Sequence, residues 1–412
     1  MCWVRLQPLW SSSCPIAILT LTLPYAISHM PITVSNRGAA RWVRGHPWIY
    51  RSDVVSPTPD SGLVPVEDPA GRFLGQALCS PRSEIRLRLL ERTTRTVDRT
   101  WWRERLNQAS ARREGIDSTG YRLVHGEGDS LPSLIVDRYD RWLVVQLLSA
   151  GLETMREDVV RALVEEFQPE GILLRNDAAV RRHEGLPEEV ALAHGGVPES
   201  IEIREGSVRY LAAPWTGQKT GAFLDQRPNR LLAGELTNSG GEALDCFAYH
   251  GSFALHLAGR AGRVLAQDTS PDALARGAEN ARLNGLTNIE WVEGDAFEVL
   301  RDFEQRRRHF DTVVLDPPAF AKSKSVVPHA LRGYKEINLL AMRILKPGGI
   351  LLTASCSFHV SRAQFLQMLG EAAADSGRRV TMVRLLGQGI DHPEVLAIPE
   401  TGYLKGAVVR AD

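Results

Sequence analysis

The segment FDTVVLDPPAF (residues 310–320) decides the fold of the second half of the chain. Its first residues are mostly apolar and β-branched, which is typical of a buried strand, and the two prolines after Asp316 stop that strand. A second segment, LLTASCSFHV (351–360), begins in the same way and reaches a polar group at Cys356. We therefore predict two neighbouring strands that end in Asp316 and Cys356.

Further strand-like runs precede and follow these two segments in the sequence, and helical segments separate the runs from one another. Such alternation implies right-handed crossovers and a parallel sheet with helices on both faces. Residues 206–412 are thus predicted to form an α/β, doubly wound domain. Two final runs, 380–388 and 403–410, are expected to add an antiparallel edge. The runs of the parallel sheet are EALDCF (242–247), RVLAQD (263–268), IEWVEG (289–294), DTVVLD (311–316) and GGILLTAS (348–355).

Two smaller domains are predicted to precede this sheet in the sequence. Residues 31–107 contain short apolar runs joined by turns, including ITVSNRGAARWVRGHPWIYRSDVV (32–55), and predict a small all-β domain. Residues 108–205 mix strands with an amphipathic helix and predict a middle α+β domain without a visible catalytic constellation. Within it, HEGLPEEVALAHGGVPES (183–200) is expected to be an irregular loop.

The charge of the chain is balanced overall but uneven along its length. The 49 Lys plus Arg match the 49 Asp plus Glu, so no field of the whole molecule attracts nucleic acid. Residues 30–113 hold 15 Arg, no Lys and 8 acidic residues, which leaves a balance of +7. This segment is either an arginine-rich surface in water or a face that contacts phosphates. Only six basic residues are lysines, and Lys219, Lys322 and Lys324 lie beside predicted site loops.

Cysteine usage and the start of the chain bear on the compartment. The five cysteines include no closely spaced pair, which argues against a disulfide framework and structural zinc and favours a cytoplasmic protein without a metal. PIAILTLTLPYAI (15–27) is apolar but too short to span a bilayer, and it only weakly resembles a signal peptide. We expect residues 1–30 to be a disordered extension, or a start assigned too early with Met30 as the true start, and we expect no membrane contact.

Four acids stand where strands of the predicted sheet end, the edge at which such sheets bind ligands. The loop CFAYHGSF (246–253) has too few glycines for a dinucleotide site but suits a nucleoside with a small charged tail. Asp268, after the second strand, can accept hydrogen bonds from both ribose hydroxyls, and Asp295, after the third, can bind an adenine amino group. Taken singly, each acid could instead cap a helix. This half resembles the class I methyltransferases, which bind S-adenosylmethionine this way. The cofactor-binding candidates are Asp245, Phe247, Tyr249, Gly251, Asp268 and Asp295.

The loop that begins at Asp316 is predicted to bind the target. Two prolines fix its backbone and remove two amide donors, which suits the Watson–Crick edge of a flipped base. A thiolate at Cys356 could attack carbon 6 of a cytosine, so that carbon 5 accepts a methyl group. Asp316, protonated or sharing a proton with ring nitrogen 3, would stabilise the charge that develops on the ring. The substrate-binding candidates of the loop are Pro317, Pro318, Phe320 and Lys322.

Five stretches together carry a closer resemblance that covers residues 31–412. They resemble the ribosomal large-subunit RNA cytosine-C5 methyltransferases, the RlmI-like family of class I enzymes. The likeness implies a PUA domain, a middle α+β domain and a Rossmann-like methyltransferase domain, with Cys356 as nucleophile. The stretches are RGAARWVRGHPWIYRSDV (37–54), GQKTGAFLDQRPNR (217–230), DCFAYHGSFALHLA (245–258), LDPPAFAKSK (315–324) and SCSFHV (355–360).

The resemblance also implies partners and further site residues. The cofactor would be S-adenosylmethionine, and the substrate one cytosine of 23S rRNA, either free or in an assembly intermediate of the large subunit. A homodimer remains an open alternative to a monomer. The residues that the resemblance adds are Phe223, Gln226 and Arg227 for the cofactor, and Arg41 and Arg44 for RNA.

Two rival functions and one departure from the family stay open. Ala319 stands where other RNA cytosine-C5 methyltransferases have a second cysteine, so the base that removes the carbon 5 proton is His359, Lys322 or a water. Similar loops occur in enzymes that methylate guanine or adenine nitrogens, which need no nucleophile. A non-catalytic RNA-binding protein is the third alternative. The presence of Cys356 favours the carbon 5 reaction over nitrogen methylation, and the acids at all four strand ends argue against a non-catalytic protein.

Overall fold

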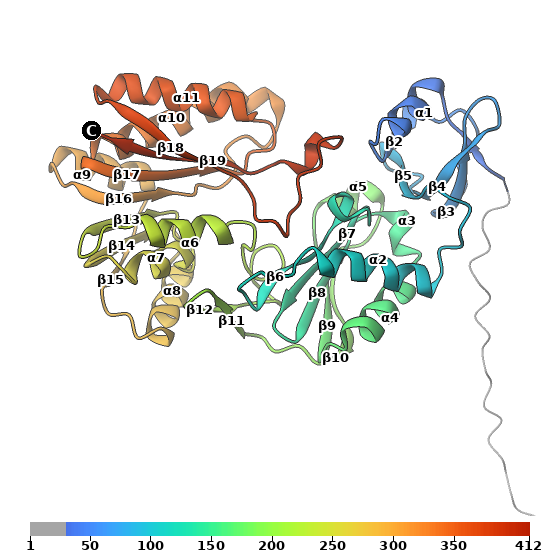
Figure 1. Cartoon of the computed structure of the whole chain (residues 1–412), viewed down its shortest axis with the longest axis horizontal. Coiled ribbons are helices and arrows are strands. Elements are labelled where there is room, and N and C mark those ends of the chain that lie inside the picture. Colours follow the sequence, from blue (N-terminus) through green and yellow to red (C-terminus); the bar gives the residue numbers. More distant parts are fainter. Residues whose placement is uncertain (1–29) are drawn as a thin grey trace, which may run out of the picture.

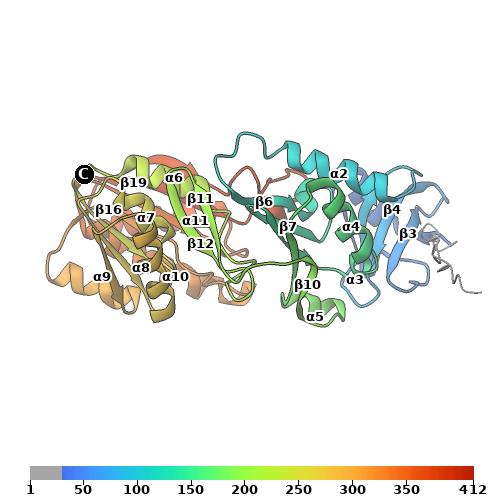
Figure 2. The same cartoon turned by 90° about the horizontal axis from the view of Figure 1, so that it is seen from below.

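The computed structural model describes residues 30–412, and the expectations for residues 1–29 lie outside the described residues. Three parts follow one another along the long axis of the molecule (Figures 1 and 2). We call them the front part (residues 30–98), the middle part (99–200) and the C-terminal part (213–412). A small β domain, an α+β domain and a doubly wound sheet occur in the predicted order, which confirms the fold class.

The front part is a five-stranded sheet in the order β1-β3-β4-β5-β2. The prediction that residues 32–55 form only strands is wrong, because Asn36–Val43 is helix α1. Ser35 caps the helix by accepting a hydrogen bond from a first-turn amide, and Ala39 and Trp42, three residues apart, are buried together at helical spacing. The other elements are β1 (Ile32–Thr33), β2 (Trp48–Tyr50), β3 (Gly62–Glu67), β4 (Phe73–Cys79), β5 (Ile85–Glu91) and a 3-10 turn at Arg51–Asp53.

Helix α2 (Arg99–Ala111) crosses the boundary predicted at residue 107. Its two adjacent tryptophans, Trp101 and Trp102, are fully buried in a core that also contains Leu78 of the front sheet and Leu163 of the middle part. Removing either tryptophan side chain from such a core costs about 3–5 kcal/mol. The helix therefore ties the front part to the middle part.

The middle part is a five-stranded sheet in the order β10-β9-β8-β7-β6. The irregular loop predicted for residues 183–200 is wrong, because Glu189–Gly195 forms the edge strand β10. Apolar side chains on both faces of this strand, with Leu192 exposed and Ala193 packed inward, hide the alternation that would have identified it. The other elements are β6 (Gly120–His125), β7 (Leu134–Tyr139), β8 (Trp142–Leu147), β9 (Gly171–Asn176), α3 (Ala150–Glu153), α4 (Arg156–Phe167), α5 (Val180–Glu184) and a 3-10 turn at Gly126–Asp129.

A β-hairpin of β11 (Ile201–Glu205) and β12 (Val208–Ala212) connects the middle and C-terminal parts. The sequence did not predict it, and the domain boundary expected after residue 205 falls in its turn. Its inner side chains share a core cluster with Tyr139 of the middle sheet and Leu255 of the C-terminal part. The hairpin is thus packed against both neighbours.

The C-terminal part confirms the predicted doubly wound sheet with its antiparallel edge. Seven strands run in the order β15-β14-β13-β16-β17-β19-β18, and the first five are parallel. Strand β19 pairs antiparallel with both β17 and β18. The strands are β13 (Glu242–Cys246), β14 (Arg263–Asp268), β15 (Ile289–Glu293), β16 (Phe310–Leu315), β17 (Leu345–Ser355), β18 (Val380–Leu386) and β19 (Lys405–Ala411).

Helices cover both faces of this sheet, with a hydrophobic core on each (Figure 1). Helices α9, α10 and α11 contribute to one core, and α6 and α7 to the other. Both faces of the parallel strands are therefore buried, which explains their continuous apolar runs. The helices are α6 (Arg227–Leu236), α7 (Ser252–Ala258), α8 (Pro271–Leu283), α9 (Ala296–Gln305), α10 (Val327–Arg343) and α11 (Arg362–Ser376), with 3-10 turns at Lys324–Val326 and Pro399–Thr401.

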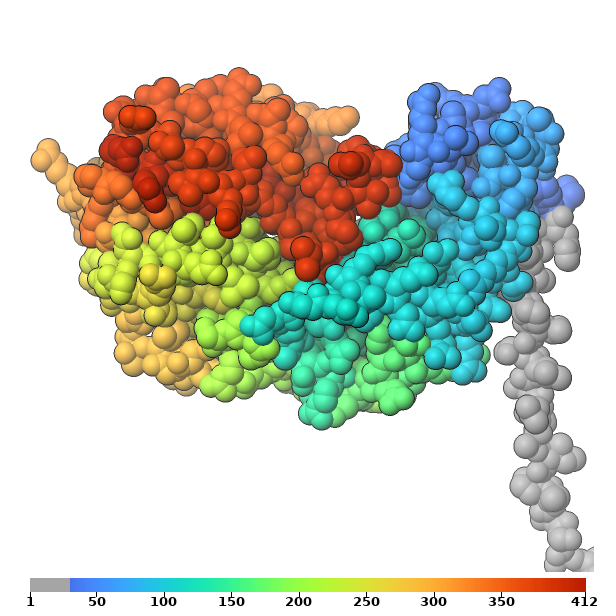
Figure 3. Space-filling model, viewed as in Figure 1, coloured from blue at the N-terminus to red at the C-terminus, as the bar shows by residue number. Residues whose placement is uncertain are grey.

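The connection between β18 and β19 (residues 387–404) leaves the C-terminal part and lies on the middle part, where it reaches the front part (Figure 3). Arg113 of the middle part donates a hydrogen bond to the Asp391 carbonyl (2.9 Å). Glu400 lies 3.3 Å from the ring nitrogen of His46 in the front part. All three parts are therefore in contact through this connection.

Within residues 30–412, no helix combines the length and the apolar character that a membrane span requires. The same range contains no group of three or more His, Cys, Asp or Glu side chains placed to hold a metal ion.

Candidate active site

A cavity of about 520 Å³ opens at the carboxyl ends of β13, β14, β16 and β17. This is the edge at which doubly wound sheets bind ligands. Its walls come from stretches that are far apart in the sequence. The lining residues are Gln218, Lys219, Phe223, Asp225, Gln226, Arg230, Phe247, Ala248, Tyr249, Ser252, Phe253, Asp268, Thr269, Ser270, Asp316, Pro317, Pro318, Cys356, Tyr403 and Leu404.

The loop after β13 is held in a strained conformation against β14. Phe247 and Tyr249 have φ angles of 64° and 51°, in the left-handed region that costs a residue with a side chain about 1–2 kcal/mol. The Tyr249 amide donates to the Asp268 carboxylate (2.8 Å), which stabilises this conformation. Both aromatic rings consequently lie on the cavity wall.

Of the three acids predicted to bind the cofactor, Asp268 is the one that lies on the cavity wall, at the end of β14. One carboxylate oxygen accepts from the Tyr249 amide and the other from the Ser270 amide (2.9 Å). A carboxylate oxygen has a second acceptor position, so each can still accept from a hydroxyl. With Phe223 packed edge-on against Tyr249, this end of the cavity fits a nucleoside: ribose hydroxyls at the acid and a base among aromatic rings.

Four cofactor candidates lie off the lining, of which Arg227 is described below and the other three lie in or beside the loops of the C-terminal sheet. Asp245 is buried and accepts from the Ala254 amide (2.9 Å), so it holds the start of α7. Gly251 has a φ of 80°, and a Cβ there would lie 2.4 Å from the Trp291 ring, so glycine is required for packing. Asp295 is exposed and caps α9 by accepting from two amides at 2.8 and 3.2 Å. Asp245 and Gly251 stabilise the loop after β13, which carries lining residues, whereas Asp295 stabilises the start of α9 away from the lining.

Asp316 and Cys356 meet at the other end of the cavity because their strands are neighbours. Strands β16 and β17 pair in parallel, with Leu315 opposite Thr353. The Cys356 Sγ lies 4.0 Å from the Pro317 carbonyl oxygen, beside the rigid loop. Both strand ends therefore present their reactive groups to one volume, as the sequence predicts.

Neighbouring groups control the protonation of Asp316. Its burial, together with the negative charge of Asp225, raises the pKa of Asp316 to about 6. Gln226 donates its amide to one carboxylate oxygen (2.8 Å), and Asn229 in turn donates to the Gln226 oxygen (2.5 Å). A group with this pKa can hold or release a proton near neutral pH.

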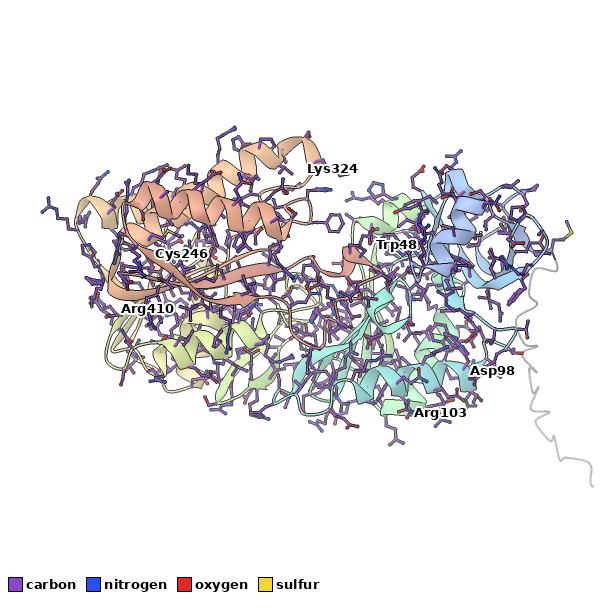
Figure 4. The ribbon with its side chains drawn as sticks, turned by 45° about the horizontal axis from the view of Figure 1, so that its top comes forward. Trp48, Asp98, Arg103, Cys246, Lys324 and Arg410 are labelled. Carbon is purple, nitrogen blue, oxygen red and sulfur yellow. The ribbon has the colours of Figure 1, made fainter. Side chains whose placement is uncertain are left out.

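The cysteines of the described residues differ in environment. Cys246 lies among the strands of the C-terminal sheet, in its core, where burial raises the pKa of the thiol well above its usual range (Figure 4). Cys79 is also buried, with its pKa raised to about 12. Cys356 is half-buried on the cavity wall, and burial and the Asp316 charge raise its pKa to about 11. Of these three thiols, only Cys356 reaches the cavity.

Several predicted residues have partners elsewhere. Arg227 lies off the lining and donates two hydrogen bonds to Asp391, both at 2.9 Å, in a buried ion pair that ties α6 to the β18–β19 connection. Phe320 packs on Tyr334, with ring centroids 4.6 Å apart, beneath the loop. The structure therefore gives Arg227 and Phe320 packing partners rather than places on the lining.

The charged RNA candidates also differ in exposure. Arg41 pairs with Asp53 (2.9 Å), whereas Arg44 and Lys322 are exposed. Several other arginines of residues 30–113 pair with acids of the middle part, as Arg88 does with Glu184 (2.8 Å). The excess of +7 is therefore partly neutralised within the molecule.

The sequence missed a group of polar residues on the lining. Asp225 accepts hydrogen bonds from the Lys219 ammonium (2.8 Å) and from the Tyr403 hydroxyl (2.7 Å). Although burial opposes ionisation, these partners hold the pKa of Asp225 below its ordinary value. The rarity of lysine indicated Lys219, but no local pattern connects Tyr403 with it, because 178 positions separate Tyr403 from Asp225.

Comparisons with known proteins agree with this architecture. Residues 32–92 match the PUA-like domain family, and residues 121–405 match the family described as S-adenosylmethionine-dependent methyltransferase. Two solved structures share the fold: a SAM-dependent methyltransferase candidate from Streptococcus mutans (TM-score 0.78, 20% identity, 92% of this chain and 100% of that one) and a methyltransferase candidate complexed with SAH (TM-score 0.81, 21% identity, the same coverage).

Curated relatives match over nearly the whole chain. The protein named ribosomal RNA large subunit methyltransferase I from Aeromonas hydrophila is 41% identical over 382 residues, which are 90% of this chain and 96% of the relative. The protein of the same name from Vibrio vulnificus is 40% identical over 377 residues, 88% of this chain and 95% of the relative. The chain therefore belongs to the ribosomal RNA large subunit methyltransferase I family of S-adenosylmethionine-dependent methyltransferases, with a PUA-like domain at its front.

Proposed function

We propose that the protein methylates carbon 5 of one cytosine in 23S rRNA through a covalent bond between Cys356 and carbon 6 of the base. The observation that carries this proposal is the position of Cys356 and Asp316 at adjacent strand ends on one cavity. Carbon 5 of cytosine is a poor nucleophile, so a methyltransferase acting there needs a thiol and an acid that address the same ring. The names of the relatives support rRNA as the substrate.

Cys356 acts as the nucleophile in this mechanism. The thiol loses its proton, Sγ bonds to carbon 6, and the electron pair of the ring double bond moves toward carbon 5 and ring nitrogen 3. Bound S-adenosylmethionine supplies the methyl group that carbon 5 then accepts. Carbon 5 finally gives up its proton to a base, the Sγ–carbon 6 bond breaks, and the thiolate returns to Cys356.

Asp316 acts as the acid. With its pKa raised to about 6, the carboxyl group can carry the proton that nitrogen 3 takes up as charge develops on the ring. Gln226 occupies one carboxylate oxygen, which leaves the other for the base. Pro317 and Pro318 line the cavity beside it and keep the loop rigid.

The cofactor is assigned to the opposite end of the cavity, where Asp268 would accept the ribose hydroxyls. Phe223, Phe247 and Tyr249 would surround the base and the sulfonium. Asp245, Gly251 and Asp295 are assigned to loop support rather than to direct contact. Exposed basic side chains, including Arg44 and Lys322, are assigned to the RNA backbone. A ribosomal RNA substrate implies that the protein acts in the cytoplasm.

The experiment is methyl transfer from labelled S-adenosylmethionine to protein-free 23S rRNA and to a large-subunit assembly intermediate, followed by nucleoside analysis. We expect labelled 5-methylcytidine from the wild type and none from Cys356→Ala. A labelled guanine or adenine, or equal activity in the alanine variant, would assign the enzyme to nitrogen methylation and Cys356 to the wall of the cavity. A protein that binds RNA but transfers no methyl group to either substrate would also contradict the proposal.

A further inference from the structure

A chain of three hydrogen bonds joins the backbone of the β18–β19 connection to Asp316. Gln226, the residue before α6, donates from its side-chain amide to Oδ1 of Asp316 (2.8 Å). Asn229, three residues further along, donates from Nδ2 to the Gln226 side-chain oxygen (2.5 Å) and to the Gly387 carbonyl oxygen (3.0 Å). Gln226 and Asn229 are 3% and 4% exposed, so water competes little for these contacts. Asn229 itself lies off the cavity lining.

The Gly387 carbonyl fixes the direction of this chain. A backbone carbonyl oxygen only accepts hydrogen bonds, so the Asn229 atom that faces it must be the amide nitrogen. The second hydrogen of the same nitrogen points to Gln226, which must therefore present its side-chain oxygen. The amide nitrogen of Gln226 then faces Asp316. The orientations of both side-chain amides thus follow from one backbone group.

The direction of the chain decides which oxygen of Asp316 carries a proton. The carbonyl oxygen of a carboxyl group accepts hydrogen bonds better than its hydroxyl oxygen, so the N–H at Oδ1 favours a proton on Oδ2. Among residues 30–412, no hydrogen bond reaches Oδ2, and Asp316 lines the cavity. Protonated Asp316 therefore offers an O–H donor to the target. If Gln226 turned over, its oxygen would draw the proton to Oδ1, and Oδ2 would become an acceptor.

A donor and an acceptor at this position favour different pyrimidines. Ring nitrogen 3 of cytosine accepts a hydrogen bond, whereas ring nitrogen 3 of uracil carries a hydrogen and donates one. A buried polar group that matches one base rejects the other, because the mismatched groups stay unpaired. An O–H donor on Oδ2 of Asp316 therefore favours cytosine.

We propose that Asn229 is a positioning residue which, through Gln226, keeps the Asp316 proton on Oδ2 and so makes the target end select cytosine over uracil. Oδ2 gives this proton to ring nitrogen 3 as Sγ of Cys356 adds to carbon 6, and recovers it when the Sγ–carbon 6 bond breaks. The role in base selection rests on the carbon 5 mechanism proposed for this site. The hydrogen-bond chain can be tested on the free protein, without RNA or cofactor.

Other charges also act on Asp316, but they do not replace this chain. The negative charge of Asp225 opposes the ionisation of Asp316, and the positive charges of Lys219 and Arg230 favour it. Gln226 is the group that contacts one oxygen of the carboxyl group and not the other. The titratable and charged groups that act on Asp316, or on which its charge acts, are Asp225, Lys219, Arg230, Asp245 and Cys356.

The first test follows the ionisation of Asp316 by NMR of protein with labelled aspartate carboxyl groups, in which Asp316→Asn identifies the signal. The Gln226 donor stabilises the ionised form, so its loss raises the pKa of Asp316. In Asn229→Leu, Gln226 can turn its oxygen toward Asp316, and we expect the pKa of Asp316 to rise by about one unit. Gln226→Met should raise it as well. Adding Asn229→Leu to Gln226→Met should change nothing further, because Asn229 acts through Gln226.

The matched control is Asn288→Leu. Asn288 also donates from Nδ2 to two oxygens, the carbonyls of Ala258 (3.0 Å) and Ala261 (2.8 Å). It lies just before β15, at the sheet edge opposite the cavity. This variant loses the same number of hydrogen bonds as Asn229→Leu but should leave the titration of Asp316 unchanged.

The second test compares methyl transfer to 23S rRNA transcripts that carry cytosine or uracil at the modified position. In Asn229→Leu, we expect the preference for cytosine to fall by about tenfold, with the affinity for RNA unchanged. Asn288→Leu should keep the preference of the wild type. A purely structural role of Asn229 would lower the amount of folded enzyme without changing this ratio.

An unchanged Asp316 titration in folded Asn229→Leu or in Gln226→Met would overturn the proposal, and so would additive shifts in the double variant. An unchanged preference for cytosine in Asn229→Leu would overturn the role in base selection. A shifted titration in a protein whose wild type makes no 5-methylcytidine would uphold the hydrogen-bond chain and reject the reaction assignment, and base selection with it.

Discussion

The two ends of the cavity are built in different ways. The end that we assign to the cofactor is built mainly from the loops after β13 and β14, where the backbone amides of Tyr249 and Ser270 donate to the carboxylate of Asp268, and Phe223 adds a ring from an earlier stretch. The target end combines Asp316 and Cys356 with side chains that come from distant stretches, such as Lys219 and Tyr403. Most of the first end is therefore specified by two adjacent loops, whereas the second end is collected from stretches across the chain. Changes at the two ends should affect different measurable quantities.

The largest effect is expected for Cys356→Ala. Losing the nucleophile should lower the single-turnover rate of methyl transfer by more than about 10³-fold, while the affinity for S-adenosylmethionine stays unchanged. Rapid-quench kinetics and calorimetric titration measure the two quantities. The matched control is Cys246→Ala, which changes a cysteine in the core at the end of β13 and should retain the rate at a stability loss of about 1 kcal/mol. A rate loss in the control alone would reverse the roles of the two cysteines.

A smaller loss of rate is expected for Asp316→Asn. Asparagine keeps the size of the side chain but cannot give a proton to ring nitrogen 3, so the rate should fall by about 10²–10⁴-fold. Because the reaction needs a protonated Asp316 and an ionised Cys356, the wild-type rate should rise with pH below about 6 and level off above it, whereas the rate of the variant should continue to rise. A pH profile of single-turnover rates checks both statements. The account of Asp316 fails if the variant keeps the wild-type rate and profile.

At the cofactor end, Asp268→Asn should weaken binding rather than chemistry. Losing two charge-assisted hydrogen bonds is expected to raise the Kd for S-adenosylmethionine by about 10–100-fold, with little change in the rate at saturation. Asp295→Ala serves as the comparison, because Asp295 caps α9 and should change the Kd by less than about threefold while costing about 1 kcal/mol of stability. Equal losses of affinity in the two variants would place the Asp295 carboxylate on the cofactor.

The smallest effect is a pH-dependent change in stability at the target end. Burial raises the pKa of Asp316 from 3.8 to about 6, so the folded protein binds a proton over that range that the unfolded chain has released. Ionisation above about pH 6 therefore destabilises the folded state. Asp316→Asn should have a higher Tm than the wild type at pH 8, and the difference should vanish below about pH 4.

Asp311, on the same strand as Asp316, provides a control of opposite sign. Burial disfavours its ionised form, but the Lys346 ammonium at 2.7 Å outweighs that effect and lowers the pKa of Asp311. Its ionised form therefore stabilises the fold above the unfolded pKa, and this contribution is lost as the pH falls. Asp311→Asn should lower the Tm at pH 8. Shifts of the same sign in both variants would contradict the assignment of the Asp316 pKa.

The two ends also differ in how far the sequence predicts them. Strand ends such as Asp268 and Asp316 are visible because each follows a short apolar run, and the order of strands brings them to one edge. Helix α1 and strand β10 were assigned wrongly because local alternation does not reveal which face is buried. Arg227 was assigned to the cofactor from the family resemblance, and the sequence could not reveal its partner Asp391, which is 164 positions away. Long-range partners of this kind depend on the tertiary fold and leave no local pattern.

The central claim, a covalent bond between Cys356 and the target base, can be tested directly with 23S rRNA in which cytidine is replaced by 5-fluorocytidine. Fluorine on carbon 5 cannot leave as a proton does, so the Sγ–carbon 6 bond should persist after methyl transfer. The account predicts a protein–RNA adduct that survives denaturation, requires S-adenosylmethionine and maps by mass spectrometry to Cys356. An enzyme that methylates normal 23S rRNA but forms no adduct with the substituted RNA, or forms one at another residue, would contradict it.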